Sequence, residues 1–397
     1  MTRTVLVLNC GSSSIKYQLI DTDTGIASAA GLVEKIGETD GEITHKEASQ
    51  TYTASGAIAD HAVGLTLMRK MFTEAGTDLA DAGIVAVGHR VVHGGPLFAT
   101  PVLIDDAVLE SIRGLSVLAP LHNPANVIGI ERARRSFPDV PHVAVFDTAF
   151  FGNLPAAAST YAIDRHVAAD YQVRRYGFHG TSHSYVSRRV AEVLDRPYDS
   201  LNQIVLHLGS GASVSAIRAG RAVETSMGMT PLEGLVMGTR SGDIDPGVIF
   251  HLHRVAGLSI DEIDVLLNRK SGMIGLSGVN DFRDLHRLIA AGDSHAQLAL
   301  DVWVHRVRKY VGAYYAVLGS LDAITFTAGV GENDAVVRRL VLADLTGLGI
   351  ALDPDLNTAG SREARVISPA GAPVSVLVVP TNEELAIAQA TAAVVGG

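Results

Sequence analysis

The sequence predicts an α/β protein with mixed sheets, divided into two related halves. Two observations support this class. Apolar segments typical of buried strands alternate with segments of helical periodicity along the 397 residues. The opening pattern of strand, glycine–serine turn and strand, residues 4–21, returns from Ile204, about half a chain length later. A chain of this length can form two or three domains, each with its own core.

The first hairpin carries more polar side chains than its turn requires. Its apolar strand ends at Asn9, crosses residues 11–14 (GSSS) and resumes as an alternating strand that contains Lys16. A tight turn needs only a Gly or an Asn. The additional hydroxyls, including those of Ser12 and Ser14, and the lysine indicate a second purpose. One candidate is the binding of a phosphate group.

The remaining elements follow the same alternation. Residues 82–95 and 141–150 read as buried strands that run into loops, and residues 296–319 have the period of a helix with an apolar face. Residues 322–345 read as a strand, a glycine loop and a helix, and the segment after residue 371 repeats that order. Polar residues gather after the carboxyl ends of these strands, where α/β folds place their ligands.

Composition excludes several classes of protein. Hydrophobic residues make up 47% and charged residues 19%, which is typical of a globular chain. The formal charge of −10 argues against nucleic acid as a partner. Cys10 is the only cysteine, so it is expected in the core and cannot form an intrachain disulfide. No signal peptide and no apolar stretch of membrane-spanning length is found, so we expect a soluble, cytoplasmic protein.

Three glycine-rich tips follow predicted strands: residues 11–14, residues 209–213 and residues 329–333. Each tip alone is as consistent with a plain turn as with a ligand loop. The phosphate-loop, dinucleotide, zinc-protease and protein-kinase motifs are absent from the sequence. Backbone N–H groups at hairpin tips and helix starts can still hold phosphates, so the coincidence of three tips favours a nucleotide.

Arginines and histidines in glycine-rich segments form a second group of candidates. Neighbouring Gly or Thr residues let an anion approach the guanidinium of Arg90 or Arg240 through two hydrogen bonds, although a structural role is equally consistent with the local sequence. Any one of the fifteen histidines is more often structural. His89 and His93 are expected with Arg90 in a loop after a strand. His122 is expected between prolines, and His179 and His183 on a glycine-broken turn.

Two carboxylate positions are ambiguous in the sequence. Asp147 directly follows an apolar strand, so it is either a helix N-cap or a site carboxylate. Thr381 and Glu384 have the spacing of a capping box, which predicts a structural role for Glu384. Glu383 then either favours the helix dipole or holds a metal ion.

Taken together, these motifs resemble the acetate kinase family, within the superfamily of sugar kinases, actin and Hsp70. The resemblance extends over the whole chain and rests on the ordered motifs VLVLNCGSSSIKYQLI, GHRVVHGG, PLHNP, FDTAF, YGFHGTSH, HLGSGAS, GTRSGDIDPG, DFRD, FTAGVGEN and PTNEELAIA. It implies two ribonuclease-H-like or actin-like domains with mixed sheets around a central nucleotide cleft. Their expected limits are 1–150 plus 383–397, with the first phosphate loop, and 151–382, with the nucleotide-binding loops.

The resemblance also implies an activity. It is the reversible, Mg²⁺-dependent transfer of the γ-phosphoryl group of ATP to acetate, which gives acetyl phosphate and ADP by direct in-line displacement. Mn²⁺ can take the place of Mg²⁺. The family further implies a homodimer and no membrane or nucleic-acid partner.

Individual roles follow from the resemblance. Asp147, His179 and Arg240 would be catalytic, with His179 and Arg240 on the transferring phosphoryl group, and Arg90 would hold the acceptor carboxylate. Because that acceptor is already ionised, we expect Asp147 to orient Mg²⁺ or an arginine rather than carry a proton. The metal would lie between Asn9 and Glu383. Acceptor binding would involve Val92, Leu121, His122, Phe178 and Pro231. Nucleotide binding would involve Ser12, Ser14, Lys16, His207, Leu208, Gly209, Ser210, Gly211, Asp281, Phe282, Arg283, Gly329, Val330, Gly331, Glu332 and Asn333.

The sequence departs from the family pattern at two places. Ser210 stands where the family more often has Asn, which puts the nucleotide preference in doubt, and Phe151-Gly152 stands where many members carry His. Other activities stay open. One methylene in an apolar pocket is worth only about 1–3 kcal/mol, so a kinase for propionate or another short carboxylate is the nearest alternative. A phosphatase or polyphosphate hydrolase on the same fold is another, and a filament protein or sugar-sensing regulator is a non-enzymatic one.

Overall fold

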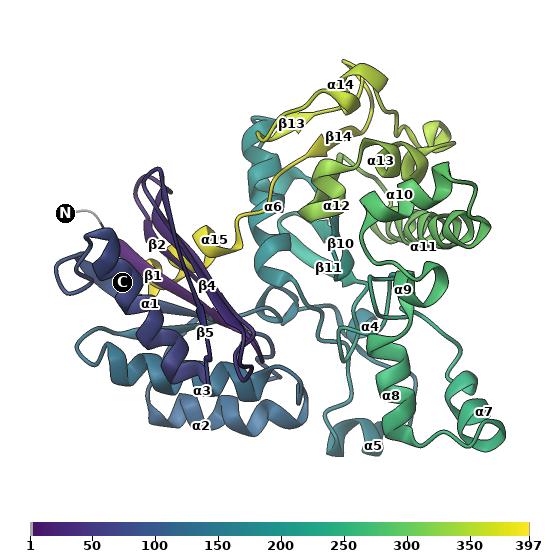
Figure 1. Cartoon of the computed structure of the whole chain (residues 1–397). Helices are drawn as coiled ribbons and strands as arrows, with labels where there is room; N and C mark the ends of the chain where they lie inside the picture. The colour runs from purple at the N-terminus through teal and green to yellow at the C-terminus, as the bar shows by residue number, and fades with distance from the viewer. Residues whose placement is uncertain (1–2, 397) are drawn as a thin grey trace. The chain divides into compact units, whose positions relative to one another are not determined.

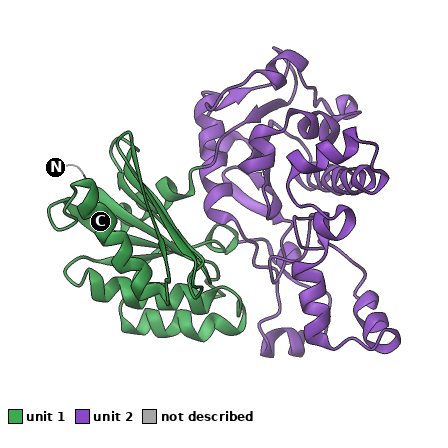
Figure 2. Cartoon of the chain, in the orientation of Figure 1, with its two compact units in different colours: residues 1–152, 382–397 green, residues 153–381 purple. Residues whose placement is uncertain are grey.

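The computed structural model describes residues 3–396 and divides the chain into two units (Figure 2). The first unit runs to Gly152 and takes up the chain again from Asn382. The second unit is Asn153–Thr381. The second unit is therefore inserted into the first, and the last helix of the chain belongs to the unit that begins the chain.

The first unit is built on a mixed sheet of eight strands in the order β5-β4-β3-β2-β1-β6-β8-β7. Strands β1, β6 and β8 are parallel, and every other neighbouring pair is antiparallel. The strands are β1 (Thr4–Cys10), β2 (Ile15–Asp21), β3 (Ala27–Glu34), β4 (Gly41–Glu47), β5 (Gln50–Gly56), β6 (Ile84–Val91), β7 (Val102–Leu103) and β8 (His142–Phe146).

Helices cover both faces of this sheet, which explains why β1 is an almost uninterrupted apolar run. Alternate strand residues point to opposite faces. Leu6 packs into the core beneath α1 and α3, whereas Val7 packs against Ile387 and Ala388 of α15. The helices are α1 (His61–Ala75), α2 (Asp106–Gly114), α3 (Asn123–Ser136) and α15 (Glu383–Gly396), with 3₁₀ turns η1 (Leu115–Val117) and η2 (Ala149–Phe151).

The second unit repeats the topology of the first. Its six strands lie in the order β11-β10-β9-β12-β14-β13, with β9, β12 and β14 parallel. Strands β9 and β10 form the second hairpin, as β1 and β2 form the first. The internal repeat predicted from the sequence is confirmed. The strands are β9 (Asn202–Leu208), β10 (Ala212–Arg218), β11 (Arg221–Thr225), β12 (Ala323–Thr327), β13 (Arg365–Val366) and β14 (Ser375–Val378).

Helices α6 (Gly180–Val193) and α11 (Ser294–Leu318) cover opposite faces of the second sheet (Figure 1). Gln203 of β9 donates to Ser187 of α6, while Arg218 of β10 donates to Val317 of α11. The other helices are α4 (Ala156–Ser159), α5 (Arg165–Asp170), α7 (Gly247–Val255), α8 (Ile260–Arg269), α9 (Gly272–Ser277), α10 (Phe282–Ala290), α12 (Ala328–Asn333), α13 (Ala335–Leu342) and α14 (Pro354–Thr358), with 3₁₀ turns η3 (Tyr198–Ser200) and η4 (Thr346–Leu348).

Three local expectations were wrong. Strand β6 continues to Val91, so His89 and Arg90 lie in the strand and not in a loop after it. Residues 329–333 belong to the short helix α12, not to a glycine loop. His183 lies within α6, and only His179 occupies the turn before that helix. In the described part of the chain, no helix has the length and apolar character needed to span a membrane.

Candidate active site

The first unit gathers polar side chains at the carboxyl ends of its three parallel strands. Asn9 lies near the end of β1, Arg90 near the end of β6, and Asp147 directly after β8. Arg90 Nε donates to Asp147 Oδ1 at 3.1 Å, and Arg90 Nη2 donates to Asp147 Oδ2 at 2.5 Å. Arg90 Nη1 is 3.4 Å from Asn9 Oδ1. Neighbouring parallel strands end at the same edge, so residues far apart in sequence meet here.

Asp147 serves as the partner of an arginine and not as a helix cap. It is only 1% exposed, and its two carboxylate oxygens each accept from Arg90. The 3₁₀ turn that follows is preceded by Thr148 and has no side-chain cap. The bidentate geometry fixes the guanidinium plane of Arg90. The sequence allowed Asp147 to be either a helix N-cap or a site carboxylate, and the structure excludes the N-cap.

The charges in this cluster perturb one another. Burial opposes the charged form of Arg90, but Asp147 and Glu383 outweigh it and hold the pKa of the guanidinium above its ordinary value. Burial raises the pKa of Glu383 to about 7; Asp147 and Glu384 add to this rise, while Arg90 opposes it. A carboxylate held in this way among other carboxylates gains most from a bound cation.

The start of α15 differs from the predicted capping box. Asn382, not Thr381, caps the helix: its Oδ1 accepts from the N–H of Leu385 at 3.0 Å. Glu384 Oε1 instead forms an ion pair with Lys16 Nζ at 2.5 Å. The capping box of Thr381 and Glu384 was predicted wrongly because the adjacent residues Thr381 and Asn382 can both cap a helix. The three-residue spacing to Glu384 favoured Thr381, whereas Asn382 is the cap.

Asn9 and Glu383 are a suitable but incomplete donor set for Mg²⁺. Both offer oxygen, the ligand atom that Mg²⁺ prefers, and Glu383 stands in a cluster of negative charge. Among residues 3–396, no group of three or more His, Cys, Asp or Glu residues is arranged to hold a metal. Magnesium sites commonly use one or two protein ligands and take the rest from phosphates and water, so the residues fit the ion in a substrate-dependent site.

The first hairpin tip is fixed by hydrogen bonds at Gly11 and exposes two serines to solvent. The N–H of Gly11 donates to the carbonyl of Ser14 at 2.8 Å, and His61 Nε2 lies 2.8 Å from the carbonyl of Gly11. Ser12 and Ser13 are exposed. The tip is therefore a fixed turn that presents hydroxyl groups to solvent.

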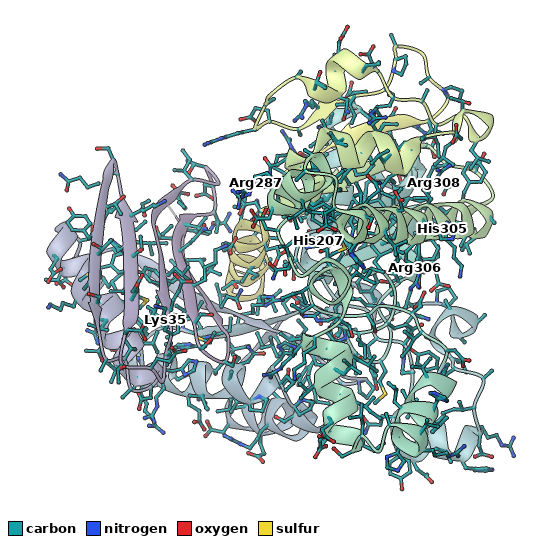
Figure 3. The ribbon with its side chains drawn as sticks, turned by 45° about the vertical axis from the view of Figure 1, so that its right-hand side comes forward. Lys35, His207, Arg287, His305, Arg306 and Arg308 are labelled. Atoms are coloured by element: carbon teal, nitrogen blue, oxygen red, sulfur yellow. The ribbon has the colours of Figure 1, made fainter. Side chains whose placement is uncertain are left out.

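The second unit gathers its motifs at the equivalent strand ends. His207, which is labelled in Figure 3, belongs to β9 and is the residue before the last of that strand. Helix α12 begins where β12 ends, and Thr381 follows β14. Glu332 Oε1 accepts from the N–H groups of Ala328 at 2.8 Å and of Thr381 at 3.1 Å. A Cβ at Gly209 would lie 3.6 Å from the Cβ of Ala328. The second hairpin tip and α12 are thus neighbours, with Glu332 joining α12 to the segment after β14.

His179 and Arg240 meet beside the second hairpin tip. A Cβ at Gly211 would lie 3.3 Å from His179 Nε2 and 3.7 Å from Arg240 Nη1. The ring of His179 stacks on the ring of His207, with centroids 4.3 Å apart. His179 has a φ of 58°, an uncommon conformation for a residue with a side chain. Two of the predicted catalytic residues therefore share one small region of this unit.

Arg240 is a half-buried cation, and hydrogen bonds of Asp243 fix the loop that carries it. Burial lowers the pKa of its guanidinium, and among the described residues no carboxylate opposes this effect. Arg240 Nη1 donates to the carbonyl of Pro231 at 3.1 Å. Asp243 fastens the loop: its Oδ1 accepts from the N–H of Gly234 at 2.8 Å, and its Oδ2 accepts from the hydroxyl of Tyr310 at 2.9 Å.

Three further predicted nucleotide residues lie at the start of α10. Asp281 caps α10 and forms a 2.6 Å ion pair with the exposed Arg283, while Phe282 is buried against Trp303. The carbonyl of Ser210 accepts from the N–H of Gly238 at 2.9 Å. Ser210 is thereby tied to the segment that leads to Arg240.

The predicted acceptor-binding residues are divided between the two units. Val92 is buried, Leu121 is 48% exposed, and His122 precedes α3, all in the first unit. Phe178 is buried and Pro231 is half-buried in the second unit. Each unit therefore contributes some of the predicted acceptor-binding residues.

Sequence reasoning missed several polar residues that support the site. Ser213 and Ser215 alternate with the apolar residues 212, 214 and 216 in strand β10, and both are fully buried. Such a spacing on one strand face indicates a buried polar partner, which here is His183. The ion pair of Lys16 with Glu384 could not be predicted from the local sequence, because the two residues are distant along the chain.

Comparison with known proteins identifies the class as phosphotransferases that use a carboxyl group as acceptor. More narrowly, the chain belongs to the acetokinase family, whose model matches residues 4–389. It is 56% identical over 393 residues to the acetate kinase of Clavibacter michiganensis subsp. michiganensis, with 99% of each chain covered. The acetate kinase structure of Porphyromonas gingivalis has a TM-score of 0.94 at 41% identity and covers 99% of both chains. A propionate kinase structure from Francisella tularensis has a TM-score of 0.92, also at 41% identity, over 98% of this chain and 99% of that one.

Proposed function

We propose that this chain transfers the γ-phosphoryl group of ATP reversibly to acetate, forming acetyl phosphate and ADP. The observation that carries the proposal is the similarity to acetate kinases over nearly the full length of both chains. The geometry of the two units supports it. One unit presents a guanidinium held rigidly by a carboxylate. The other presents a half-buried guanidinium that no carboxylate of residues 3–396 contacts.

Phosphoryl transfer depends mainly on alignment and on compensation of charge at the phosphoryl oxygens. We assign that compensation to Arg240 and to a hydrogen bond from His179, because both lie within 3.7 Å of one point beside Gly211. An arginine without a carboxylate partner can direct its full charge toward an anionic substrate. The nucleotide would be held by residues 207–211 at the second hairpin tip, by residues 281–283, and by residues 329–333 of α12.

Arg90 is proposed to bind the acceptor carboxylate. A guanidinium has five N–H donors, and three of those of Arg90 are directed at Asp147 and Asn9. The others would bind the substrate. A simple carboxylic acid has a pKa of about 4–5, so the acceptor is already an anion at neutral pH and needs no general base. Asp147 would therefore hold Arg90 in place rather than transfer a proton.

Asn9 and Glu383 would hold Mg²⁺ together with phosphate oxygens and water. When bound, the ion supplies positive charge at the phosphates. Lys16 and the hydroxyls of Ser12 and Ser14 would face the same phosphates. A homodimer and a cytoplasmic location are also part of the proposal, and both rest on resemblance to the family.

A kinase for propionate is the second candidate. The propionate kinase from Francisella tularensis is as similar in sequence as the Porphyromonas gingivalis acetate kinase, at 41% identity for each. The apolar residues that we assign to the acyl group are Val92 and Leu121 in the first unit, and Phe178 and Pro231 in the second. Because one methylene changes binding by only about 1–3 kcal/mol, acceptor length must be measured.

A hydroxamate assay tests the proposal directly. The enzyme is incubated with ATP, Mg²⁺, hydroxylamine and acetate, propionate or butyrate, and the acyl phosphate is trapped as a coloured hydroxamate. We expect the strongest signal with acetate and a fall with chain length. A stronger signal with propionate would establish the second candidate. ATP hydrolysis without hydroxamate from any acid would indicate a phosphatase and remove the role given to Arg90.

A further inference from the structure

A continuous chain of hydrogen bonds leads from the interior of the second unit to His179. Ser215 Oγ lies 2.7 Å from His183 Nδ1, His183 Nε2 lies 2.8 Å from Ser213 Oγ, and Ser213 Oγ lies 2.9 Å from His179 Nδ1. Ser213 and Ser215 are two residues apart on β10, so both face α6, which carries His183. The two serines and His183 are fully buried.

The direction of each hydrogen bond in this chain can be worked out from its inner end. Burial, with His207 nearby, holds the pKa of His183 well below its ordinary value, so its ring is neutral and has one N–H and one lone pair. The buried hydroxyl of Ser215 needs an acceptor for its proton, and its partner in the structure is His183 Nδ1. Ser215 therefore donates to Nδ1, and the proton of His183 is on Nε2.

The same logic continues outward to His179. His183 Nε2–H donates to Ser213 Oγ, so the single hydroxyl proton of Ser213 is directed at His179 Nδ1. A neutral His179 must then carry its proton on Nε2. This nitrogen is the one that lies 3.3 Å from a Cβ at Gly211, beside Arg240. We propose that Ser215, His183 and Ser213 are positioning residues that set the tautomer of His179, so that its Nε2–H donates to the transferring phosphoryl group.

The surroundings of His179 explain why the tautomer matters. The guanidinium of Arg240 approaches the same point beside Gly211, and the ring of His207 from β9 stacks on that of His179. His207 is in turn bonded through Nδ1 to Ser182 Oγ, which contacts Thr381. A neutral ring donates through Nε2 only when Nδ1 carries the lone pair, and a hydrogen bond donated by Ser213 to Nδ1 favours that arrangement.

This inference rests on the proposed function for its consequence, but the tautomer can be measured without activity. Histidine is labelled with ¹⁵N, and the His179 resonances are assigned by their absence in His179→Gln. We expect the neutral ring of the wild type to be protonated on Nε2. A neutral ring protonated on Nδ1 would overturn the proposal. If the hydroxamate assay is silent while Nε2 carries the proton, the proposed function fails and the relay stands.

Variants at Ser215, which does not touch His179, test whether the chain acts as a unit. In Ser215→Asp an ionised carboxylate accepts from His183 Nδ1, which reverses every bond and places the proton of His179 on Nδ1. We expect kcat to fall about 10-fold to 100-fold at pH 8, because Nε2 of His179 then carries a lone pair instead of the N–H that donates. Ser215→Asn is the matched control, since its amide can still donate, and should stay within about threefold of wild type.

The KM values for ATP and acetate should change little in both variants. Circular dichroism establishes that each variant is folded. If Ser215→Asp does not fold, Ser215→Ala replaces it and is expected to show both tautomers of His179 by ¹⁵N. Unchanged ¹⁵N shifts of His179 in a folded Ser215→Asp or Ser215→Ala protein would contradict the relay.

Discussion

At the scale of single residues, the two site arginines are held in different ways. Arg90 is matched by the buried carboxylate of Asp147, which keeps its pKa high and its plane fixed. Arg240 is half-buried, donates to a carbonyl, and has a lowered pKa through burial. A buried charge without a counter-ion costs folding free energy. That cost is reasonable where an anionic substrate supplies the missing charge, as a phosphoryl donor would.

Arg240→Ala should lower kcat about 100-fold to 1000-fold, because the loss of one well-placed donor to a developing charge has an effect of this size. The free energy of unfolding should not fall and can rise slightly, since a partly desolvated cation is removed. Steady-state kinetics with the hydroxamate assay measures the first quantity, and urea unfolding the second. Arg339→Ala, at an exposed arginine of α13, is the control. A loss of activity explained by unfolding would contradict this assignment.

At the scale of elements, the loop that carries Arg240 is supported by the start of α9. The N–H groups of Ser271, Met273 and Ile274 donate to the carbonyls of Thr239, Met237 and Gly238 at 3.1, 2.9 and 3.0 Å. Gly272 has a φ of 63°, and a Cβ there would lie 2.1 Å from the carbonyl oxygen of Met237. The helix start and the loop therefore fit only with glycine at this position.

Gly272→Ala should lower the free energy of unfolding by about 3 kcal/mol or more, because backbone strain and a backbone clash act together. Any folded fraction should have a reduced kcat, since the clash displaces the Arg240 loop. Gly257→Ala is the matched control: its φ is 70°, but a Cβ there meets nothing within 4 Å. It should cost only about 1–2 kcal/mol. Equal losses in urea unfolding of the two variants would show that strain alone, without the clash, decides the outcome.

The same scale shows what the sequence can and cannot predict. Alternating apolar patterns predicted the hairpins, and helical periodicity predicted α11, since both features are set by local sequence. The end of β6 and the helical state of residues 329–333 were missed, because a glycine-rich segment after a strand is compatible with both loop and helix. Local sequence made Arg90 and Asp147 candidates but could not join them, as their contact depends on the pairing of β6 with β8.

At the scale of the whole molecule, each unit holds a buried neutral histidine. His89 Nε2 lies 2.9 Å from His142 Nδ1 in the first unit, and His183 lies in the relay of the second. Burial lowers the pKa of both His89 and His183 well below 6.5. The unfolded chain binds a proton at these residues below pH 6.5 and the folded chain does not. Their contribution to stability is thus present above pH 6.5 and is lost as the pH falls.

Between pH 7.5 and pH 5.5 the wild type should lose about 1.4 kcal/mol of unfolding free energy through His89 alone. In His89→Asn this residue cannot bind a proton, so the free energy of unfolding should fall by about 1.4 kcal/mol less than in the wild type over the same pH interval. Urea unfolding followed by far-ultraviolet circular dichroism gives the slope of unfolding free energy against pH for the wild type and for the variant. A variant slope equal to that of the wild type would mean that His89 is protonated in the folded protein.

The position of α15 has a consequence for biosynthesis. The sheet of the first unit needs this helix to cover Val5, Val7 and Val143, yet α15 is translated only after the whole of residues 153–381. On the ribosome, that apolar face stays open to chaperones while the second unit can already complete its own core. We therefore expect the usual order of domain folding during synthesis to be inverted here. The first unit closes last, and the same event delivers Glu383 to Asn9, Arg90 and Asp147.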